Sequence, residues 1–249
     1  LGIFVGFPLV VWLLLAALPW GFGTELRTGL LVLAVLPTTI STAVVYAGQS
    51  GGNAATALFN ATLSNLLGIL VVPLALVAMQ VGAGAGPALD TGAFFQKIGM
   101  LVVAPFVVGQ GLRLAGCRPD KHRGAGQRWC QALILYILLA TFHVSFQQGA
   151  FGEGAGVPLG HLLMFLAALT VLVRLAAPWL GRGFAAEHRP AVFFCVTEKT
   201  LATGLPMATA LFGSGHPALG VLVLPVLLYH PVQLLVDGVL ASRWGGRGR

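Results

Sequence analysis

The sequence is poor in charged residues: Lys, Arg, Asp and Glu together make up 8% of its 249 residues. Soluble domains carry about 25% charged residues, so this deficit excludes an ordinary soluble domain. Hydrophobic residues make up 57% of the chain, and its mean hydropathy is +0.90. We therefore expect a membrane protein in which most side chains face the lipid bilayer or other helices.

Cysteine is also scarce, and the common metal and nucleotide motifs are missing. Cys117, Cys130 and Cys195 are odd in number and widely spaced, which predicts neither a disulfide framework nor a metal site. The sequence has no His-Glu-x-x-His motif, no Cys-x-x-Cys pair and no phosphate-binding glycine loop. These absences argue against zinc and nucleotide chemistry, and we expect no cofactor other than a coupling ion.

Long apolar stretches indicate the fold class. A helix that crosses a bilayer needs about 20 predominantly apolar residues. The expected spans are 2–20, 26 into a polar segment at 36–42, 53–76, 94–114, 129–146, 158–180, 189 into a second polar segment at 197–206, and 217–240. They predict an all-α polytopic membrane protein. The chain opens on Leu1 inside an apolar run, with no Met and no cationic flank, so we interpret it as a fragment rather than as a signal peptide.

Basic residues indicate the orientation of these spans. The net charge of +7 comes from cations in short loops, a pattern that fits membrane topology better than nucleic-acid binding. Ten of the 14 Lys and Arg residues fall on one side: Arg113, Arg118, Lys121, Arg123, Arg128, Arg182, Arg189, Arg243, Arg247 and Arg249. The positive-inside rule then places the C-terminus in the cytoplasm. We expect a multi-pass protein of the plasma membrane with no nucleic-acid partner; the oligomeric state stays open.

Two polar segments interrupt otherwise apolar helices. The first is Leu36-Pro37-Thr38-Thr39-Ile40-Ser41-Thr42, and the second runs from Thr197 to Pro206. Backbone in a bilayer core must satisfy its own hydrogen bonds, so a helix there is normally unbroken. Breaks at corresponding positions in two halves of a membrane protein are typical of the central binding site of a transporter. Transport is therefore the leading hypothesis.

The order of the spans suggests an internal repeat. Counted from the C-terminus, the second half has five helices, and its broken helix is the fourth. The first half has one span before its broken helix and one after it, so a matching repeat would lack two upstream helices. An odd number of helices makes the two halves inverted in the membrane. We predict one transmembrane transporter domain, 1–249, with the remainder of the first repeat at 1–79 and the second repeat at 92–241.

Three ordered motifs resemble the SBF-like branch of the bile acid:sodium symporter family. They are Leu36-Pro37-Thr38-Thr39 through Gly51-Gly52-Asn53-Ala54-Ala55 to Asn65-Leu66-Leu67-Gly68 and Pro73; Glu198-Lys199-Thr200-Leu201-Ala202-Thr203-Gly204-Leu205-Pro206-Met207-Ala208; and Leu224-Pro225-Val226-Leu227-Leu228-Tyr229-His230-Pro231-Val232-Gln233-Leu234. The resemblance spans nearly the whole chain. It implies ten helices in two inverted repeats of five, with the fourth and ninth helices broken and crossing, so that this chain begins at the third helix.

The resemblance also implies a site, residue by residue. Bile acid transporters couple organic-anion uptake to sodium, and their crossover Ser-Asn pair falls here at Thr42 and Ala43. Their two hydroxyl ligands on the next helix fall at Thr56 and Asn60, which are four residues apart and share a helical face. Their ninth-helix glutamate falls at Thr197 or Glu198.

This sequence departs from the family pattern at two places. The ninth-helix Gln-Asn pair of the family is Leu201-Ala202 or Ala202-Thr203 here, and a third-helix glutamine is Ile3.

The residue types at the expected crossing suit co-binding of a cation and an anion. Side-chain oxygens come from Ser41, Thr42, Thr56, Asn60, Thr200 and Thr203, and Glu198 adds negative charge. Sodium prefers such oxygen ligands, and we expect Thr42, Thr56, Asn60 and Glu198 to hold it. Half-helix N-termini carry partial positive charge and suit a small organic anion as substrate.

Lys199 has three readings. A charged Lys in mid-membrane costs at least about 2.5–3.5 kcal/mol, so it needs a partner or a water-filled cavity. Its ammonium could occupy a former sodium position and pair with Glu198 or with a substrate anion. It could instead form a proton-coupled switch with Glu198, since buried Lys and Glu titrate readily. The third reading is a Lys that snorkels to the interface.

Other polar residues in apolar runs have structural interpretations. We expect Arg174 to snorkel toward the cytoplasmic face, Asp237 to be interfacial, and Asn65 to bond a neighbouring helix. His143 and His230 either bind substrate, shuttle protons or bond neighbouring helices.

Three rival functions remain at this point. A sodium-independent or proton-coupled carrier and a non-transporting membrane regulator would share the same fold. The Gly48-Gln49-Ser50-Gly51 segment matches the Gly-x-Ser-Gly form of rhomboid intramembrane proteases, with His143 or His230 as base. A small-residue turn explains these four residues as well, and we expect no enzyme.

Overall fold

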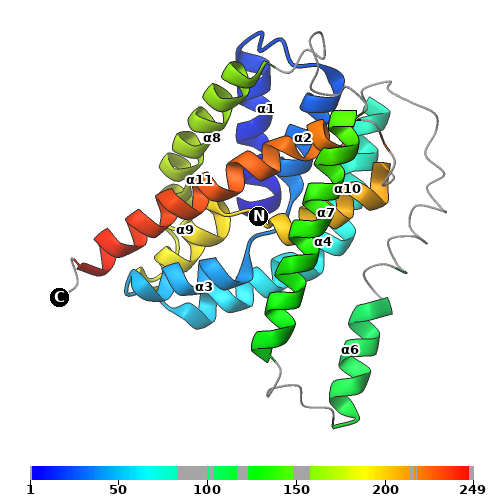
Figure 1. Ribbon diagram of the computed structural model, residues 1–249. Coiled ribbons are helices and arrows are strands. Elements are labelled where there is room, and N and C mark those ends of the chain that lie inside the picture. The colour runs from blue at the N-terminus through cyan, green and yellow to red at the C-terminus, as the bar shows by residue number, and fades with distance from the viewer. Residues whose placement is uncertain are drawn as a thin grey trace.

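The computed structural model describes residues 2–82, 100, 104–116, 123–147, 158–212, 216 and 218–246, and the structural statements below concern these residues. Every regular element among them is a helix (Figure 1). The elements are a π-helical turn η1 (Gly2–Gly6), α1 (Phe7–Ala17), α2 (Thr24–Val35), α3 (Ile40–Gln49), α4 (Ala54–Gly82), α6 (Ala104–Leu114), α7 (Arg123–Gln147), α8 (Leu159–Leu180), a 3₁₀ turn η4 (Ala186–His188), α9 (Arg189–Thr197), α10 (Leu201–Phe212) and α11 (Leu219–Gly246). The expected all-α class is confirmed.

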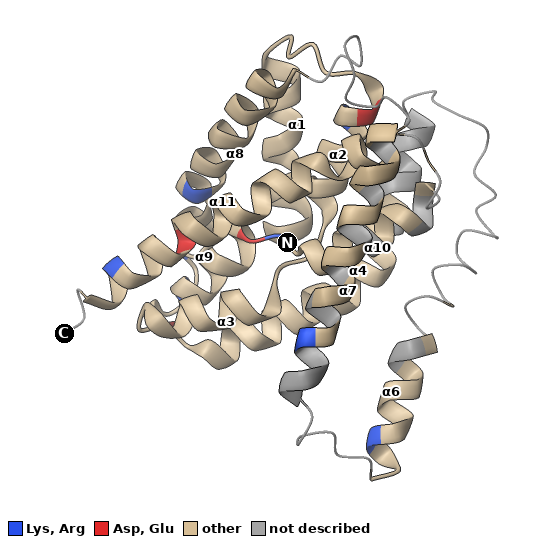
Figure 2. Cartoon of the chain, viewed as in Figure 1, with Lys and Arg blue, Asp and Glu red and all other residues tan. Residues whose placement is uncertain are grey.

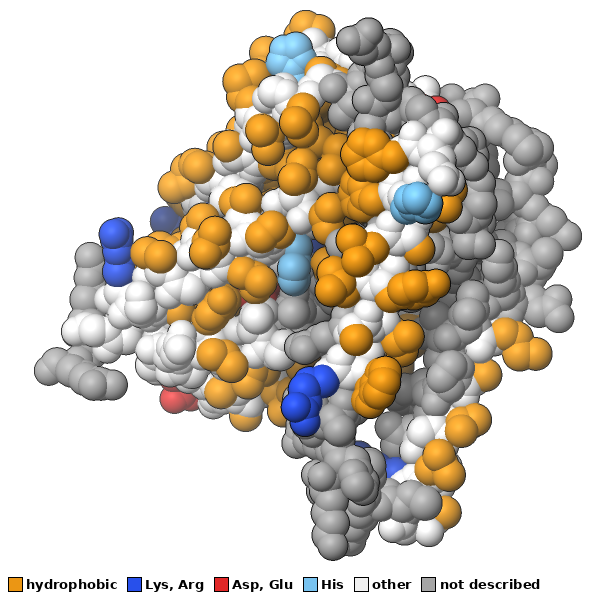
Figure 3. Space-filling model, viewed as in Figure 1, with side chains coloured by type: hydrophobic (Ala, Val, Ile, Leu, Met, Phe, Trp, Pro, Cys, Tyr) orange, Lys and Arg blue, Asp and Glu red, His pale blue; other side chains and the backbone are white. Residues whose placement is uncertain are grey.

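Several helices are long and apolar enough to cross a bilayer. Among the described residues these are Ala54–Val72, Leu159–Leu180 and Leu219–Gly246, together with the pair α2 and α3, which bends by 55° at its break. Hydrophobic side chains cover the outer faces of α7, α8 and α11 in the view of Figure 3. Exposed apolar surface on this scale marks a membrane or a protein interface, and helices of this length and hydropathy identify the protein as a multi-pass membrane protein.

The order of elements follows the expected spans. α1, the broken pair α2 and α3, and α4 form the first part, while α8, the broken pair α9 and α10, and α11 occur in the second. Of the span expected at 94–114, only Met100 and residues from Ala104 onward are described. α11 extends beyond the expected end at 240 to Gly246. The inverted relation of the two parts and their boundaries at 1–79 and 92–241 stay predictions.

The first break follows from the local sequence. The residue before a proline avoids the helical region because the proline ring clashes with it. Leu36, which precedes Pro37, is accordingly extended at φ −60° and ψ 146°, and α2 ends one residue earlier. Thr39 is also extended, and α3 begins after it.

The second break is narrower than the polar segment that predicted it. Only residues 198–200 lie outside the helices, and Gly204 and Pro206 lie inside α10. Glu198 is extended at φ −93° and ψ 142° although no proline follows it. Its conformation therefore depends on partners elsewhere in the fold.

α2 and α11 approach each other very closely at Gly29. A Cβ atom added there would lie 2.3 Å from the carbonyl oxygen of Leu222, which is backbone and cannot move aside. We expect Gly29→Ala to destabilise the protein by about 1–3 kcal/mol, the usual cost of overpacking.

The measurement is the melting temperature in detergent. Gly160→Ala on α8 is the matched control, because a Cβ there meets no other atom within 4 Å. Equal melting temperatures for the two variants would contradict the close contact of α2 with α11.

Candidate functional site

The two helix breaks meet in the interior of the protein. The backbone N–H of Thr200 donates to the carbonyl of Pro37 at 3.0 Å, and the hydroxyl of Thr39 donates to the carbonyl of Lys199 at 3.1 Å. These bonds join segments about 160 residues apart in sequence. The crossing thus satisfies backbone groups that each break leaves without a helical partner.

α4 holds the first break in place. The amide nitrogen of Asn65 donates to the carbonyl of Thr38 at 2.8 Å, and the N–H of Thr38 donates to the hydroxyl of Ser64 at 3.1 Å. Asn65 therefore bonds a neighbouring segment, as expected. The hydroxyl oxygen of Thr38 is itself buried and has no partner within the described structure.

Gln233 on α11 holds the second break, a role that was not predicted from the sequence. Its amide oxygen accepts from the N–H of Lys199, and its amide nitrogen donates to the carbonyl of the same residue, both at 2.7 Å. Its exposed fraction is 0%. A single amide side chain thus replaces the helical partners that Lys199 lacks. A polar residue in the middle of an apolar span was the signal that could have found it.

Glu198 lies fully buried at the crossing. One carboxylate oxygen accepts a hydrogen bond from the hydroxyl of Thr42 on α3. The other, Oε1, is buried without a hydrogen-bond partner in the described structure. The exposed fraction of the residue is 0%. A buried carboxylate oxygen without a partner is costly, so this atom is a candidate ligand for a cation.

Lys199 points away from Glu198. In the extended break consecutive side chains lie on opposite sides, and the described ion pairs do not include one between these two residues. The ammonium of Lys199 instead donates to the carbonyls of Ile3, Ala34 and Leu36. With an exposed fraction of 1%, Lys199 does not snorkel, so that reading and the pairing with Glu198 are both wrong.

Arg174 and Asp237 form a buried ion pair, which corrects two expectations. Arg174 Nε lies 2.8 Å from Asp237 Oδ1, and the side chains are 8% and 0% exposed. Arg174 therefore does not extend to the surface of the protein, and Asp237 is buried against Arg174 of α8 rather than exposed at the end of its span. The sequence could not show that two charges 63 residues apart lie on facing helices and neutralise each other.

This ion pair extends toward the crossing. The hydroxyl of Thr197, the last residue of α9, donates to Asp237 Oδ2 at 3.1 Å. The hydroxyl of Tyr229 donates to the carbonyl of Thr197 at 2.8 Å. Thr197 thus fixes the end of α9 to α11, one residue before Glu198.

The remaining predicted site residues are distributed unevenly. Thr200 is buried at the crossing, and Ser41 lies on the exposed side of the first turn of α3. Thr56 bonds the ring nitrogen Nδ1 of His188 at 2.9 Å, and His188 precedes Glu198 by the whole length of α9, about 15 Å at 1.5 Å per residue. Asn60 is half-buried on α4. The side chain of Thr203 lies outside the described part of the structure.

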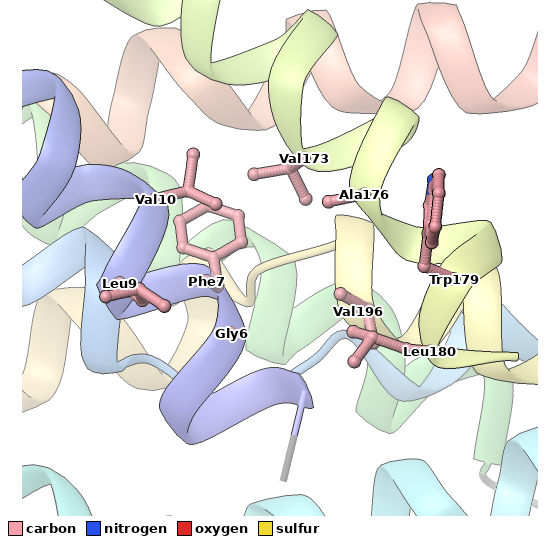
Figure 4. Close-up of a pocket in the computed structure, with 9 residues that line it drawn as sticks. All are labelled: Gly6, Phe7, Leu9, Val10, Val173, Ala176, Trp179, Leu180 and Val196. Atoms are coloured by element: carbon pink, nitrogen blue, oxygen red, sulfur yellow. The ribbon is translucent and has the colours of Figure 1, made fainter.

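A separate pocket of about 400 Å³ lies between α1, α8 and α9 (Figure 4). Its lining consists of Gly6, Phe7, Leu9, Val10, Val173, Ala176, Trp179, Leu180 and Val196. None of the nine predicted site residues lines it. Its apolar lining suits a hydrocarbon surface rather than a small ion.

The protease reading finds no support in the geometry. The hydroxyl of Ser50 donates to the carbonyl of Tyr46 within α3 at 2.8 Å, His230 contacts Lys199 and Gln233, and His143 is exposed on α7. Neither histidine bonds Ser50 in the part of the chain that the structure describes.

An all-helical membrane protein whose two broken helices cross at a buried polar site belongs to the class of secondary transporters. The family model described as the SBF-like CPA transporter family matches residues 1–245. Over 248 residues the chain is 32% identical to sodium/bile acid cotransporter 7 of Danio rerio, covering 95% of this chain and 70% of the relative. It is 30% identical to the putative symporter YfeH of Escherichia coli, covering 97% and 72%. Uncharacterized protein PA2026 of Pseudomonas aeruginosa is 34% identical, covering 98% and 73%.

The chain therefore belongs to the SBF-like CPA transporter family, and it is a membrane transporter rather than an enzyme. The family resemblance read from the three sequence motifs is confirmed.

Proposed function

We propose that the protein is a symporter that couples the uptake of small organic anions to sodium, with its site at the crossing of the two broken helices. The observation that carries this proposal is the carboxylate of Glu198, which is fully buried and has one oxygen without a hydrogen-bond partner. A carboxylate in such surroundings is stabilised when a cation binds beside it. In an alternating-access carrier, a site that is stable only with its cation bound makes substrate transport depend on binding of that cation.

Thr42 and Glu198 are the proposed core of the sodium site. Thr42 lies in the first turn of α3 and Glu198 lies in the second break. The two side chains already contact each other, so a bound cation would join α3 to the second break. Both supply oxygen, which hard cations prefer. Thr56 is engaged by His188 at the far end of α9, so the proposed site does not depend on it. Asn60 stays a predicted ligand; it lies on α4 one turn after Thr56 and before Asn65, which bonds the first break.

The substrate is proposed to be a small organic anion. α3 and α10 both begin at the crossing, at Ile40 and Leu201, and helix N-termini carry about half a positive charge. A carboxylate or sulfonate beside a sodium ion would be stabilised by both. Relatives named as a sodium/bile acid cotransporter and a symporter support this assignment.

We also propose a plasma-membrane location with the C-terminus in the cytoplasm. The end of α6 and the start of α7, which carry Arg113 and Arg128, lie at the same lower end of the view, whereas the start of α2, with Glu25, lies at the upper end (Figure 2). The start of α2 also carries Arg27 beside Glu25, so the lower ends carry two of these three arginines, and this excess fits the positive-inside rule.

The test is thermal stability in detergent, with sodium exchanged for potassium at constant ionic strength. A ligand that binds only the folded state adds about 2.7 kcal/mol at a hundredfold excess over its Kd. We expect a saturable, sodium-specific rise in melting temperature that Glu198→Gln removes.

Glu187→Gln is the matched control, because Glu187 lies on the exposed η4 turn, where its side chain is 65% exposed. It should keep the full sodium effect. Equal melting in sodium and potassium would overturn sodium coupling and favour a sodium-independent or proton-coupled carrier.

A further inference from the structure

The ammonium of Lys199 lies in a cage of backbone carbonyls. Its Nζ atom is 3.0 Å from the oxygen of Ile3, 3.0 Å from that of Ala34 and 2.8 Å from that of Leu36. An ammonium group has three N–H donors and no acceptor, so three carbonyls satisfy it completely. No carboxylate lies within ion-pair distance of Lys199 among the described residues.

Each of these carbonyls is available for a local reason. Ala34 is one of the last four residues of α2, whose carbonyls have no helical partner. Leu36 lies in the break itself. Ile3 belongs to the π-helical turn Gly2–Gly6, in which the partner of its carbonyl would be residue 8, and Pro8 has no N–H. The three carbonyls therefore lack helical partners for reasons that do not involve the Lys199 side chain.

The cage is electrostatically suited to a single positive charge. The carbonyl end of a helix carries about half a negative charge, and the end of α2 supplies the Ala34 oxygen. The face of the Phe7 ring covers the ammonium with its centroid 4.2 Å from Nζ, which adds a cation–π attraction. Phe7 is fully buried, so the charge is shielded from water.

We propose that Lys199 is a built-in monovalent cation. Its ammonium permanently occupies a carbonyl site that would otherwise bind a free monovalent cation, and it joins the second break to the end of α2 and the start of the chain. This inference rests on the proposed function, in which the exchangeable coupling ion is then confined to the site of Glu198 and Thr42. Glu198 and Lys199 are adjacent but serve different sites, because the extended break directs the Glu198 side chain to the exchangeable-ion site and the Lys199 side chain to the cage.

The test removes the tethered cation and supplies a free one. Lys199→Ala deletes three carbons and the ammonium, which n-propylammonium replaces atom for atom. We expect n-propylammonium chloride to raise the melting temperature of this variant by several degrees in a saturable way, relative to choline chloride at the same ionic strength. The wild type should show no difference between the two salts. A folded Lys199→Ala protein that melts equally in both would overturn the proposal.

Two further variants separate the cage from its surroundings. Lys199→Met fills the same space without charge, so n-propylammonium should not stabilise it. Glu198→Gln combined with Lys199→Ala should keep the n-propylammonium effect, because Glu198 supplies no atom to the cage. If the proposed sodium coupling is wrong, the wild type will melt equally in sodium and potassium. If the cage is wrong, n-propylammonium will not stabilise the variants that carry Lys199→Ala.

Amine labelling of the wild type decides the matter if Lys199→Ala cannot be purified in either salt. Reductive methylation followed by peptide mass analysis reports Lys199, with the protein unfolded in detergent as the reference. Labelling of the folded protein in sodium should be at least about tenfold slower, because the ammonium reacts only after local opening. Labelling at the rate of the unfolded reference would show that the ammonium leaves the cage, and would overturn the proposal.

Discussion

Replacing Arg174 by methionine is expected to destabilise the protein by about 3–5 kcal/mol, the usual cost of leaving one member of a buried ion pair alone. Asp237 would then lie at 0% exposure without its cation, with the hydroxyl of Thr197 as its remaining described partner. The end of α9 would lose its fixed position, and sodium-dependent stabilisation should fall with it. Thermal unfolding in detergent measures the first effect.

The double variant Arg174→Met/Asp237→Leu separates the charge from the packing. Well-packed apolar residues in place of a buried ion pair are often neutral or stabilising, so the double variant should recover most of the loss. Arg182→Met is the control, because Arg182 lies in the turn after α8, is exposed, and rests over the ring of Trp179 at 3.6 Å. A double variant as unstable as the single one would contradict this account of the pair.

Glu198→Gln and Thr42→Val are each expected to abolish sodium-driven anion uptake while leaving the protein folded. The first removes the buried negative charge, and the second removes the hydroxyl that bonds it. Both substitutions nearly conserve volume, so the crossing should keep its backbone bonds to Pro37 and Gln233. The measurement is uptake of a panel of carboxylate and sulfonate anions into proteoliposomes under an inward sodium gradient.

Thr56→Val is the matched control for Thr42→Val. Thr56 was predicted in the same sodium ligand set, but its hydroxyl bonds His188 at the opposite end of α9. We expect this variant to keep sodium-driven uptake. Loss of uptake in Thr56→Val, with normal uptake in Thr42→Val, would move the sodium site away from the crossing.

Gln233 and Asn65 illustrate how far polar residues in apolar spans can be interpreted. Both bond backbone carbonyls in the breaks, and neither position follows from hydropathy alone. A polar side chain inside a span predicts a partner, because its cost in lipid is otherwise high. It does not tell which of the many carbonyls in the protein that partner is.

The sequence by itself determined the class of the protein and much of its layout. Scarce charge and long apolar stretches required transmembrane helices, and Pro37 required α2 to end at or before the residue ahead of it. Two polar segments in corresponding helices indicated where a site would form, and three motifs indicated the family. Each of these signals is local, so it can be read without knowing what lies beside it.

Only the tertiary structure decided which partners the buried charges and the other polar groups have. Lys199 bonds a carbonyl 196 residues away, Arg174 pairs with Asp237 on another helix, and Thr56 pairs with His188 rather than with the crossing. The second break has no proline of its own and is held open by Gln233 and Pro37. The physical reason is the same in these four cases. In a low-dielectric interior a polar group bonds whichever partner the helix packing brings within hydrogen-bond distance. That packing is set by contacts between distant parts of the chain, which local sequence signals do not contain.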